Sequence, residues 1–279
     1  MAAYDSARIH PTSLISPEAD LAPDVEVGPF AIIEGRVQVG AGCRIHARAH
    51  LIGPATLGEN NEIYSNAVIG GRPQHLAYKG EPTGVEIGNN NIFRENVTIH
   101  RGTTHSWVTR IGSNNLLMVG AHVGHDCKVG NRCILTNNSL LGGHCELEDN
   151  VYVSGNAALH QFVKVGRLAF ISGLSASTKD VPPFIIQQNI NEVYGVNLVG
   201  MRRAGLTSAQ IDAVRRLYHI VYLQGLALPN ALIQVMSELG HVDVAREFVQ
   251  FVKNSKRGIC AAPGRKLSKD NNAGLAAAA

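Results

Sequence analysis

Aliphatic side chains recur at every sixth position over most of the chain. One unbroken run of eleven such positions extends from Ile9 to Ile69, and a second run of eleven extends from Ile111 to Ile171. A period of six matches neither the 3.6-residue repeat of a helix nor the two-residue alternation of a strand. It is typical of a short strand followed by a turn, and three such units make one triangular coil of about 18 residues. The pattern therefore predicts a mainly β fold, a parallel β-helix of hexapeptide repeats.

A second phase precedes each aliphatic position by two residues and holds mostly small side chains, for example Ala31, Ala49, Ala121 and Ala157. We expect both phases to point into the prism, where stacked coils bury them between parallel strands. Glycine often follows the aliphatic position, with Asn or Asp nearby. We expect these residues to supply the positive φ angles that the corners need.

Two segments interrupt the period, at about residues 71–84 and 102–110. Excursions from a solenoid usually lie on one face, and that face is often where ligands bind. We interpret both as functional loops, with plain surface decoration as the alternative.

The repeat ends near the Val181-Pro182-Pro183 stretch, and helical patterns follow. Thr207 and Gln210 form a capping-box pattern at the start of the first helix. Further helices are predicted over residues 229–239 and 242–253. The predicted organisation is a β-helix over residues 1–190, an α-helical domain over 191–258 and a disordered tail over 259–279.

Composition and charge narrow the class of protein. Aromatic residues make up 5% of the chain and glycine contributes 29 residues, which suits a regular fold of small and aliphatic side chains. The net charge of +3 comes from the segment after Lys256, and it does not indicate nucleic acid as the main partner. The sequence contains no run that predicts a transmembrane segment and no signal-peptide pattern, so we expect a soluble cytoplasmic protein.

The cysteines do not form a pattern typical of a metal site or a nucleophile. Cys43, Cys127, Cys133 and Cys145 all occupy the small inward phase. We interpret them as packing residues, because free Cys behaves as a small hydrophobic side chain. Cys260 lies in the tail region, where the sequence gives no interpretation.

The histidines of the coils avoid both inward phases and therefore lie on corners or outer faces. With about 18 residues in a coil, His125, Gly143 and Gln161 should form one vertical column. His144 and His160 flank this column, His122 precedes it on the same coil, and His100 also points outward. We interpret only His46 and His50 as solvated.

A clustered set of imidazoles favours either zinc binding or general-base catalysis. Zinc requires three imidazoles about 2.0–2.1 Å from one ion, and the three-residue spacing of His122 and His125 does not favour it. We predict no metal and no cofactor. In the alternative, Asp126 orients His125 as the base and the Gly143 N–H serves as an oxyanion donor. That arrangement suits an alcohol attacking a bound carbonyl with no covalent enzyme intermediate.

Several segments closely resemble the UDP-N-acetylglucosamine O-acyltransferases, the enzymes that open lipid A biosynthesis. They are residues 85–103, 114–135, 159–162, 180–184 and 195–203, and the AHVGHDC and HQF elements among them are specific. The likeness extends over nearly the whole chain to about Gly258. It implies a left-handed β-helix and a homotrimer with active sites between neighbouring prisms. It also implies an acyl carrier protein with a (3-hydroxy)acyl chain as the donor and the 3-hydroxyl of UDP-N-acetylglucosamine as the nucleophile.

The resemblance also implies roles for individual residues. His125 corresponds to the general base, Asp126 to its partner and Gly143 to the oxyanion donor. Gly173 matches the position that limits acyl-chain length, where a glycine leaves room for a longer chain. The positions implied to contact substrate are Gln74, His122, His144, His160 and Gln161, and those implied to hold the nucleotide are Asn197 and Arg203.

The chain departs from the family pattern in its first loop. The family usually has Gln-Asp-Leu-Lys where this chain has Gln74-His75-Leu76-Ala77, and Ala204 stands where a second arginine often follows Arg203. Acyl length, 3-hydroxyl preference and acylation of a 3-amino sugar nitrogen therefore stay open. A non-enzymatic β-helix binding module is the more distant alternative, and it predicts scattered rather than stacked histidines.

Overall fold

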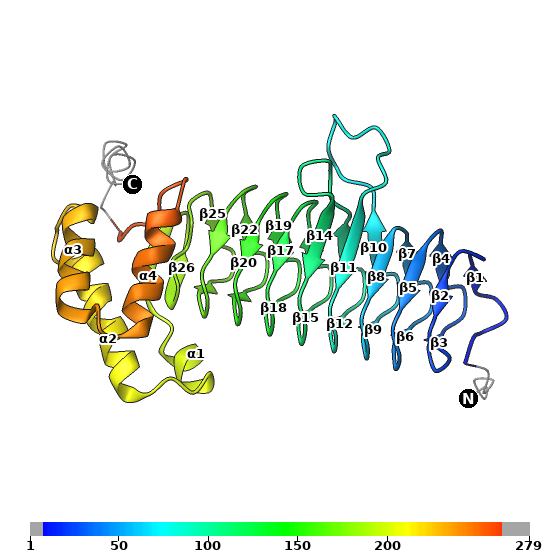
Figure 1. Cartoon of the computed structure of the whole chain (residues 1–279), viewed down its shortest axis with the longest axis horizontal. Helices are drawn as coiled ribbons and strands as arrows, with labels where there is room; N and C mark the ends of the chain where they lie inside the picture. The colour runs from blue at the N-terminus through cyan, green and yellow to red at the C-terminus, as the bar shows by residue number, and fades with distance from the viewer. Residues whose placement is uncertain (1–7, 264–279) are drawn as a thin grey trace.

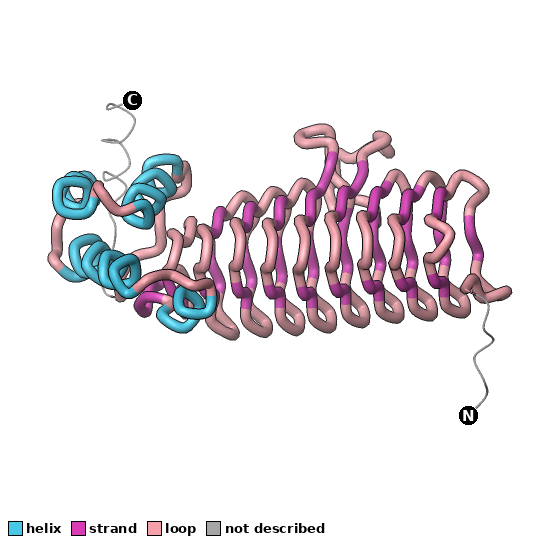
Figure 2. The backbone as a smooth tube through the Cα atoms, turned by 60° about the horizontal axis from the view of Figure 1, so that its bottom comes forward, coloured by secondary structure: helices cyan, strands magenta, loops and turns pink. Residues whose placement is uncertain are grey.

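The computed structural model describes residues 8–263, in which the chain winds into a long prism that ends in a cluster of helices (Figure 1). Three sheets of nine, eight and ten strands form the walls of the prism. Within them every strand pair is parallel except β26 with β27, which is antiparallel. Figure 2 shows the stacked coils as successive rungs along the long axis.

The strands are short, and each wall takes one strand from each coil. The nine-stranded sheet consists of β1 (Leu14–Ile15), β4 (Ile32–Glu34), β7 (His50–Ile52), β10 (Val68–Gly71), β13 (Thr98–His100), β16 (His122–Val123), β19 (Leu140–Leu141), β22 (Ala158–Leu159) and β25 (Ala176–Ser177). The eight-stranded sheet consists of β2 (Asp20–Leu21), β5 (Val37–Val39), β8 (Ala55–Leu57), β11 (Gly84–Ile87), β14 (Val108–Ile111), β17 (Lys128–Val129), β20 (Glu146–Leu147) and β23 (Lys164–Val165). The ten-stranded sheet consists of β3 (Glu26–Val27), β6 (Arg44–Ile45), β9 (Glu62–Ile63), β12 (Ile92–Phe93), β15 (Leu116–Leu117), β18 (Ile134–Leu135), β21 (Tyr152–Val153), β24 (Phe170–Ile171), β26 (Ile185–Gln188) and β27 (Glu192–Val196).

The register of the sheets confirms the predicted coil of 18 residues. Ile33 pairs with Leu51, and Val123 pairs with Leu141. The aliphatic and small phases are both buried, and Cys43, Cys127, Cys133 and Cys145 lie inside the prism as predicted. Burial of these stacked side chains between successive coils is the main stabilising term of such a fold.

Glycine and asparagine have different tasks at the corners: the predicted positive φ angles are found at Asn residues, whereas the glycine that follows the aliphatic position seldom has one. Asn60 and Asn90 have φ angles of 55° and 57°, and the same corner position repeats along the prism. The glycine after the aliphatic position is needed for close approach instead: a Cβ added to Gly58 would lie 2.8 Å from the carbonyl oxygen of Gly88. Asparagine tolerates the left-handed region better than most side chains.

The two excursions appear as jumps in the register. Ile69 pairs with Ile99, thirty residues later, and Ile99 pairs with Val123, twenty-four residues later. The first excursion therefore adds twelve residues to a coil and the second adds six. Both loops leave the prism on one side, near β10, β11 and β14 (Figure 1). After the second excursion the coils return to a period of 18 residues, as the pairs of Val123 with Leu141 and Leu141 with Leu159 show.

The helical region comprises α1 (Leu198–Arg203), α2 (Ser208–Tyr218), the π-helical turn η1 (His219–Leu223), α3 (Leu228–Leu239) and α4 (Asp243–Asn254). The capping box at Thr207 is confirmed, because its hydroxyl accepts from the Gln210 N–H while the Gln210 side chain accepts from the Thr207 N–H. Arg167 joins this region to the prism through two hydrogen bonds of 2.8 Å to Glu247 of α4. No helix within residues 8–263 is long and apolar enough to cross a membrane.

The prediction of a disordered tail over 259–279 is wrong at its start. Ile259 and Cys260 are buried, and the Cys260 N–H donates to the Asp180 carbonyl at 3.0 Å. Ile259 also forms a parallel bridge with Asp180. The chain thus returns from the helices to the last coil. Cys260 is completely buried there and packs as a small hydrophobic side chain. Residues 264–279 lie outside the described part of the chain.

Candidate active site

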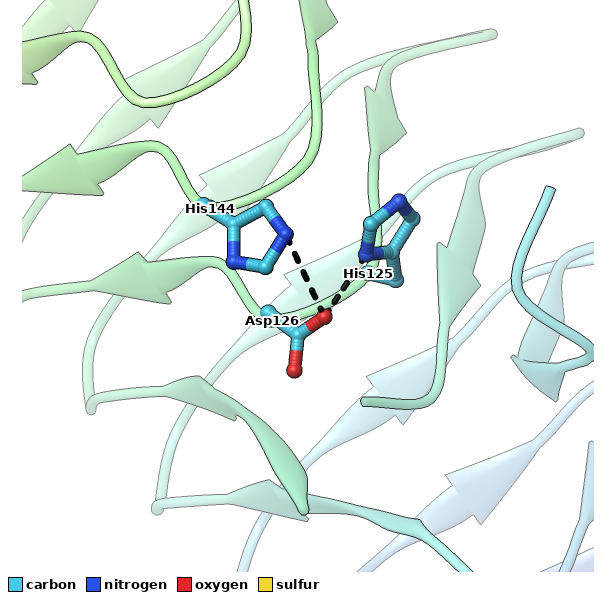
Figure 3. A group of neighbouring side chains, drawn as sticks. All are labelled: His125, Asp126 and His144. Atoms are coloured by element: carbon cyan, nitrogen blue, oxygen red, sulfur yellow. Dashed lines mark hydrogen bonds and ion pairs between the residues drawn. The ribbon is translucent and has the colours of Figure 1, made fainter. Parts of the chain in front are cut away.

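A histidine and a carboxylate form a buried pair at the corner between β16 and β17. His125 Nδ1 lies 2.7 Å from Asp126 Oδ2, and the two side chains are 10% and 0% exposed (Figure 3). Since a carboxylate accepts, Nδ1 carries the proton and the lone pair of the imidazole lies on Nε2. This is the orientation that a general base requires.

The second excursion surrounds the Asp126 carboxylate with donors. Oδ1 accepts from the N–H groups of Thr103 and Ser106 at 2.9 and 3.2 Å and from the Ser106 hydroxyl at 2.5 Å. Oδ2 accepts from the Thr103 hydroxyl at 2.8 Å. Asp126 itself occupies the left-handed corner position, with φ of 61°, and its N–H donates to the Thr109 hydroxyl. Burial favours the neutral acid, but the bonds from His125, Ser106 and Thr103 outweigh it and hold the pKa of Asp126 well below its usual range.

Gly143 lies directly over the imidazole of His125, one coil further along the prism. A Cβ on Gly143 would lie 2.7 Å from His125 Cε1 and Nε2, so only glycine leaves room for the ring. The His144 N–H donates to the His125 carbonyl, and the Phe162 N–H donates to the Gly143 carbonyl. These bonds confirm the predicted column of His125, Gly143 and Gln161. Within residues 8–263, no protein group accepts a hydrogen bond from the Gly143 N–H.

His144 is the second imidazole near the carboxylate. Its Nε2 is 3.7 Å from Asp126 Oδ2, and its ring meets that of His125 edge to face at 5.0 Å (Figure 3). The His144 ring also stacks on the Phe162 ring, with the ring centroids 4.2 Å apart. The ring of His105, in the second excursion, meets the His144 ring edge to face, with the centroids 4.7 Å apart. Burial lowers the pKa of His144, although Asp126 opposes this shift. A neutral, tightly packed imidazole therefore closes one side of the site.

A groove runs past His125 on the other side. It is lined by Gln74, Thr98, His100, His122, Gly124, His125, Leu140, Leu141, Gly142, Gly143, Leu159 and Gln161. His122 Nδ1 lies 2.7 Å from the Thr98 hydroxyl, and the rings of His122 and His100 meet edge to face at 5.0 Å. Burial, helped by His122 and His125, lowers the pKa of His100 to about 4. Imidazoles held neutral in a groove are suited to hydrogen bonding with an uncharged polar ligand group.

Some predicted site residues do not reach His125 within one chain. Asn197 caps α1 by accepting from the Gly200 N–H and donates to the Leu168 carbonyl. Arg203 lies exposed in the last turn of α1, and Gly173 is exposed on an outer turn. His160 is exposed as well, with its Nδ1 3.3 Å from the Arg257 guanidinium. The structure brings together Gln74, His122, His125, Asp126, Gly143, His144 and Gln161.

Sequence reasoning missed Thr98, Thr103, His105 and Ser106, and it identified His100 as an outward histidine without assigning it to the site. Thr98 and His100 belong to β13, and their outward positions beside His122 follow from the sheet register. The register therefore contained a usable signal for these two. The other three belong to the second excursion, which has no period to place them.

Three side chains could together hold a cation, namely His125, Asp126 and His144. Each offers one ligand atom, and these three atoms lie within 4.8 Å of one another. However, Asp126 Oδ2 already accepts from His125 Nδ1 and the Thr103 hydroxyl. A metal on these atoms would compete with the bond that orients His125. The absence of a metal stays a prediction, which treatment with a chelator can test.

Known proteins resemble the chain along its length. The family model described as UDP-N-acetylglucosamine O-acyltransferase, domain 2, matches residues 180–260. The bacterial transferase hexapeptide model matches residues 36–71 and 109–143. An acyl-[acyl-carrier-protein]–UDP-N-acetylglucosamine O-acyltransferase of Anaeromyxobacter sp. is 48% identical over 254 residues, which is 90% of this chain and 98% of the relative.

Solved structures agree with this match. The UDP-N-acetylglucosamine acyltransferase of Francisella novicida has a TM-score of 0.89 at 34% identity, covering 92% of this chain and 95% of its own. That of Bacteroides fragilis has a TM-score of 0.88 at 40% identity, covering 90% of this chain and 99% of its own. With the hexapeptide match, these likenesses confirm the predicted left-handed parallel β-helix followed by a small helical region.

Proposed function

This chain belongs to the family of UDP-N-acetylglucosamine O-acyltransferases, and we propose that it transfers a (3-hydroxy)acyl chain from acyl carrier protein to the 3-hydroxyl of UDP-N-acetylglucosamine. This reaction is the first step of lipid A biosynthesis. The observation that supports the proposal most is the buried His125–Asp126 pair, whose free imidazole edge lies against Gly143. The names of the relatives favour oxygen rather than nitrogen as the acylated atom.

In the proposed mechanism, His125 Nε2 removes the proton of the sugar 3-hydroxyl as the oxygen attacks the thioester carbonyl. Asp126 stabilises the imidazolium that forms, and the Gly143 N–H donates to the oxyanion of the tetrahedral intermediate. When the intermediate collapses, the carbon–sulfur bond breaks and the imidazolium returns its proton to the leaving thiolate. The ester forms, the carrier thiol is released and His125 is neutral again.

We infer a homotrimer: the family resemblance implies three chains, and one chain alone does not complete the predicted site. Asn197, Arg203 and Gly173 lie toward the helical end of the prism, away from the corner that holds His125. A second copy packed alongside would bring its nucleotide-binding and acyl-binding residues to the His125 groove. Sedimentation or light scattering should give the mass of three chains, and a monomer that is fully active would contradict this inference.

The first excursion carries the positions that bear most on substrate choice. His75 meets the edge of the His125 ring at 5.2 Å, and it lines a second cavity with Ala77, Tyr78 and Thr103. An imidazole thus stands beside the base where the family usually has a carboxylate, and the methyl group of Ala77 lines the second cavity where the family usually has an ammonium group. We propose that His75 contacts the sugar or the acyl group in place of that carboxylate.

Mass spectrometry of the products tests the proposed function. The purified protein is incubated with a mixture of (3-hydroxy)acyl carrier proteins and either UDP-N-acetylglucosamine or its 3-amino analogue. We expect ester formation on the 3-hydroxyl, unchanged by a chelator. A strong preference for the amine would favour the N-acyltransferase alternative. No product from either sugar would overturn the acyltransferase proposal.

A further inference from the structure

The second excursion directs its polar groups toward one acceptor. Of the hydrogen bonds that the Asp126 carboxylate accepts, all but the one from His125 come from Thr103 and Ser106. Trp107, with φ of 64°, and the bond of 2.7 Å from its N–H to the Thr103 carbonyl close the turn that carries these donors. The loop is thus folded around the carboxylate.

Ser106 provides two of these donors from a single residue. Its N–H and its hydroxyl both reach Oδ1, the oxygen that does not contact His125. The hydroxyl also lies 3.1 Å from the Val108 carbonyl, but the carboxylate contact is shorter and involves a charged acceptor. With Oδ1 fixed in this way, the carboxylate cannot rotate about its last bond, and Oδ2 stays on His125 Nδ1.

We propose that Ser106 is a positioning residue for the acyl transfer: its hydroxyl fixes the rotation of Asp126 and, through it, the orientation of the His125 imidazole. The inference rests on the proposed function of His125 as the base. It assigns a task to a residue that touches neither the groove nor the imidazole, and to a loop whose sequence suggested only a ligand contact.

Among residues 8–263, the titratable groups in closest interaction with Asp126 are His125 at 2.7 Å, His144 at 3.7 Å and, through a longer-range charge interaction, the buried thiol of Cys127. The cavity that Asp126 lines is also lined by His105, Lys128, Glu146, Lys164, Asp180, Lys256 and Arg257. Loss of the Ser106 hydroxyl leaves the charge on Asp126 less stabilised and raises the pKa of that carboxyl. Without that hydroxyl the carboxylate can rotate, Oδ2 leaves His125 Nδ1, and the imidazole loses the partner that orients it.

The test compares Ser106→Ala, which lacks the hydroxyl, with Ser106→Thr, which keeps it. We expect Ser106→Ala to lower kcat about tenfold, the scale of one hydrogen bond to a charged group, with little change in KM. The acid limb of its kcat profile should move to lower pH, because an imidazolium that has lost its carboxylate partner releases its proton more readily. Ser106→Thr should restore most of both. Ser139→Ala is the matched control, because it removes a buried hydroxyl that has no hydrogen-bond partner, and its rate and profile should equal those of the wild type.

An Ser106→Ala enzyme with the rate and pH profile of the wild type would overturn the inference. A lower kcat with an unchanged pH profile, not restored by Ser106→Thr, would also overturn it, because a structural defect gives this combination of results. If the wild type makes no product, the proposed function fails separately. The imidazole signals of ¹⁵N-histidine-labelled protein then decide: the inference requires a slowly exchanging His125 Nδ1 proton that is lost in Ser106→Ala, and an identical signal in both proteins contradicts it.

Discussion

Imidazole–carboxylate pairs occur in two very different settings in this prism, one on a wall and one at a corner. His50 lies 3.2 Å from Glu34, whose side chain is 65% exposed, and His125 lies 2.7 Å from Asp126, whose side chain is completely buried. The first pair is screened by water and contributes little to either stability or chemistry. The second is enclosed by the loop over residues 102–110 and by the next coil, which supply hydrogen bonds to the carboxylate and exclude water from it.

The difference teaches that the repeat supplies a uniform scaffold and that its interruptions supply the chemistry. The same hexapeptide coils carry both pairs: Glu34 and His50 lie on the neighbouring strands β4 and β7, and His125 and Asp126 lie at the corner between β16 and β17. Only the second has a loop folded against it. A carboxylate in such a setting stays ionised and oriented, which is what activation of a neighbouring imidazole requires.

Replacement of the imidazole should show the largest difference in kcat between the two pairs. His125→Ala should lower kcat about 10³-fold, within the range for loss of a general base. His50→Ala, the matched change in the exposed pair, should leave kcat within about twofold, since surface substitutions have small effects. Steady-state assays with acyl carrier protein substrate measure both. Equal losses of kcat in the two variants would show that neither imidazole has a special role in catalysis.

A methyl group placed between the coils should have the next largest effect. In Gly143→Ala the new Cβ would meet the His125 ring at 2.7 Å, so the ring must move off its partner. We expect kcat to fall by about 10- to 100-fold and the free energy of unfolding by about 1–3 kcal/mol, as for overpacking. At Gly155 the nearest atom would be 3.5 Å away, an ordinary contact. Gly155→Ala should therefore change neither quantity measurably, and a large loss there would indicate that any added methyl group is harmful.

The smallest expected effect concerns the groove histidine, His100, whose pKa is about 4 in the folded protein. The unfolded chain binds a proton at this residue near pH 6.5, so between these values the unfolded state holds more protons than the folded state. The contribution of His100 to the free energy of unfolding is therefore fully present above about pH 6.5, and it is lost as the pH drops toward 4. Chemical denaturation should show this as about 1–3 kcal/mol. His100→Gln should lack that part of the slope, and an unchanged slope would contradict the lowered pKa.

The sequence was sufficient to predict the coils and the column of His125, Gly143 and Gln161, because a period of 18 residues places one coil over the next without knowledge of side-chain packing. It was not sufficient to place Thr103 and Ser106 against Asp126. Those residues are 23 and 20 positions away in the chain and belong to a loop with no period, so no register relates them to the corner. The return of Cys260 to the last coil was missed for a similar reason: its contacts are with residues 83 and 81 positions earlier.

The sequence did not show which corner residues take the positive φ angle, because two physical demands favour glycine. Close approach between coils and a positive φ angle both select glycine. Only the structure separates them, with Gly58 meeting the first demand and Asn60 the second. The same corner position holds Asp126 and His144, at φ angles of 61° and 62°. Two residues of the site therefore occupy a backbone conformation that the repeat imposes.

A double-mutant cycle in kcat tests most directly whether Asp126 acts through His125. If it does, Asp126→Asn alone should lower kcat about 10²-fold, and His125→Ala together with Asp126→Asn should be no slower than His125→Ala alone, within about threefold. The contradicting result is a double variant slower than His125→Ala by the full factor that Asp126→Asn shows alone. Independent effects of that kind would mean that the enclosed carboxylate does not work through the imidazole beside it.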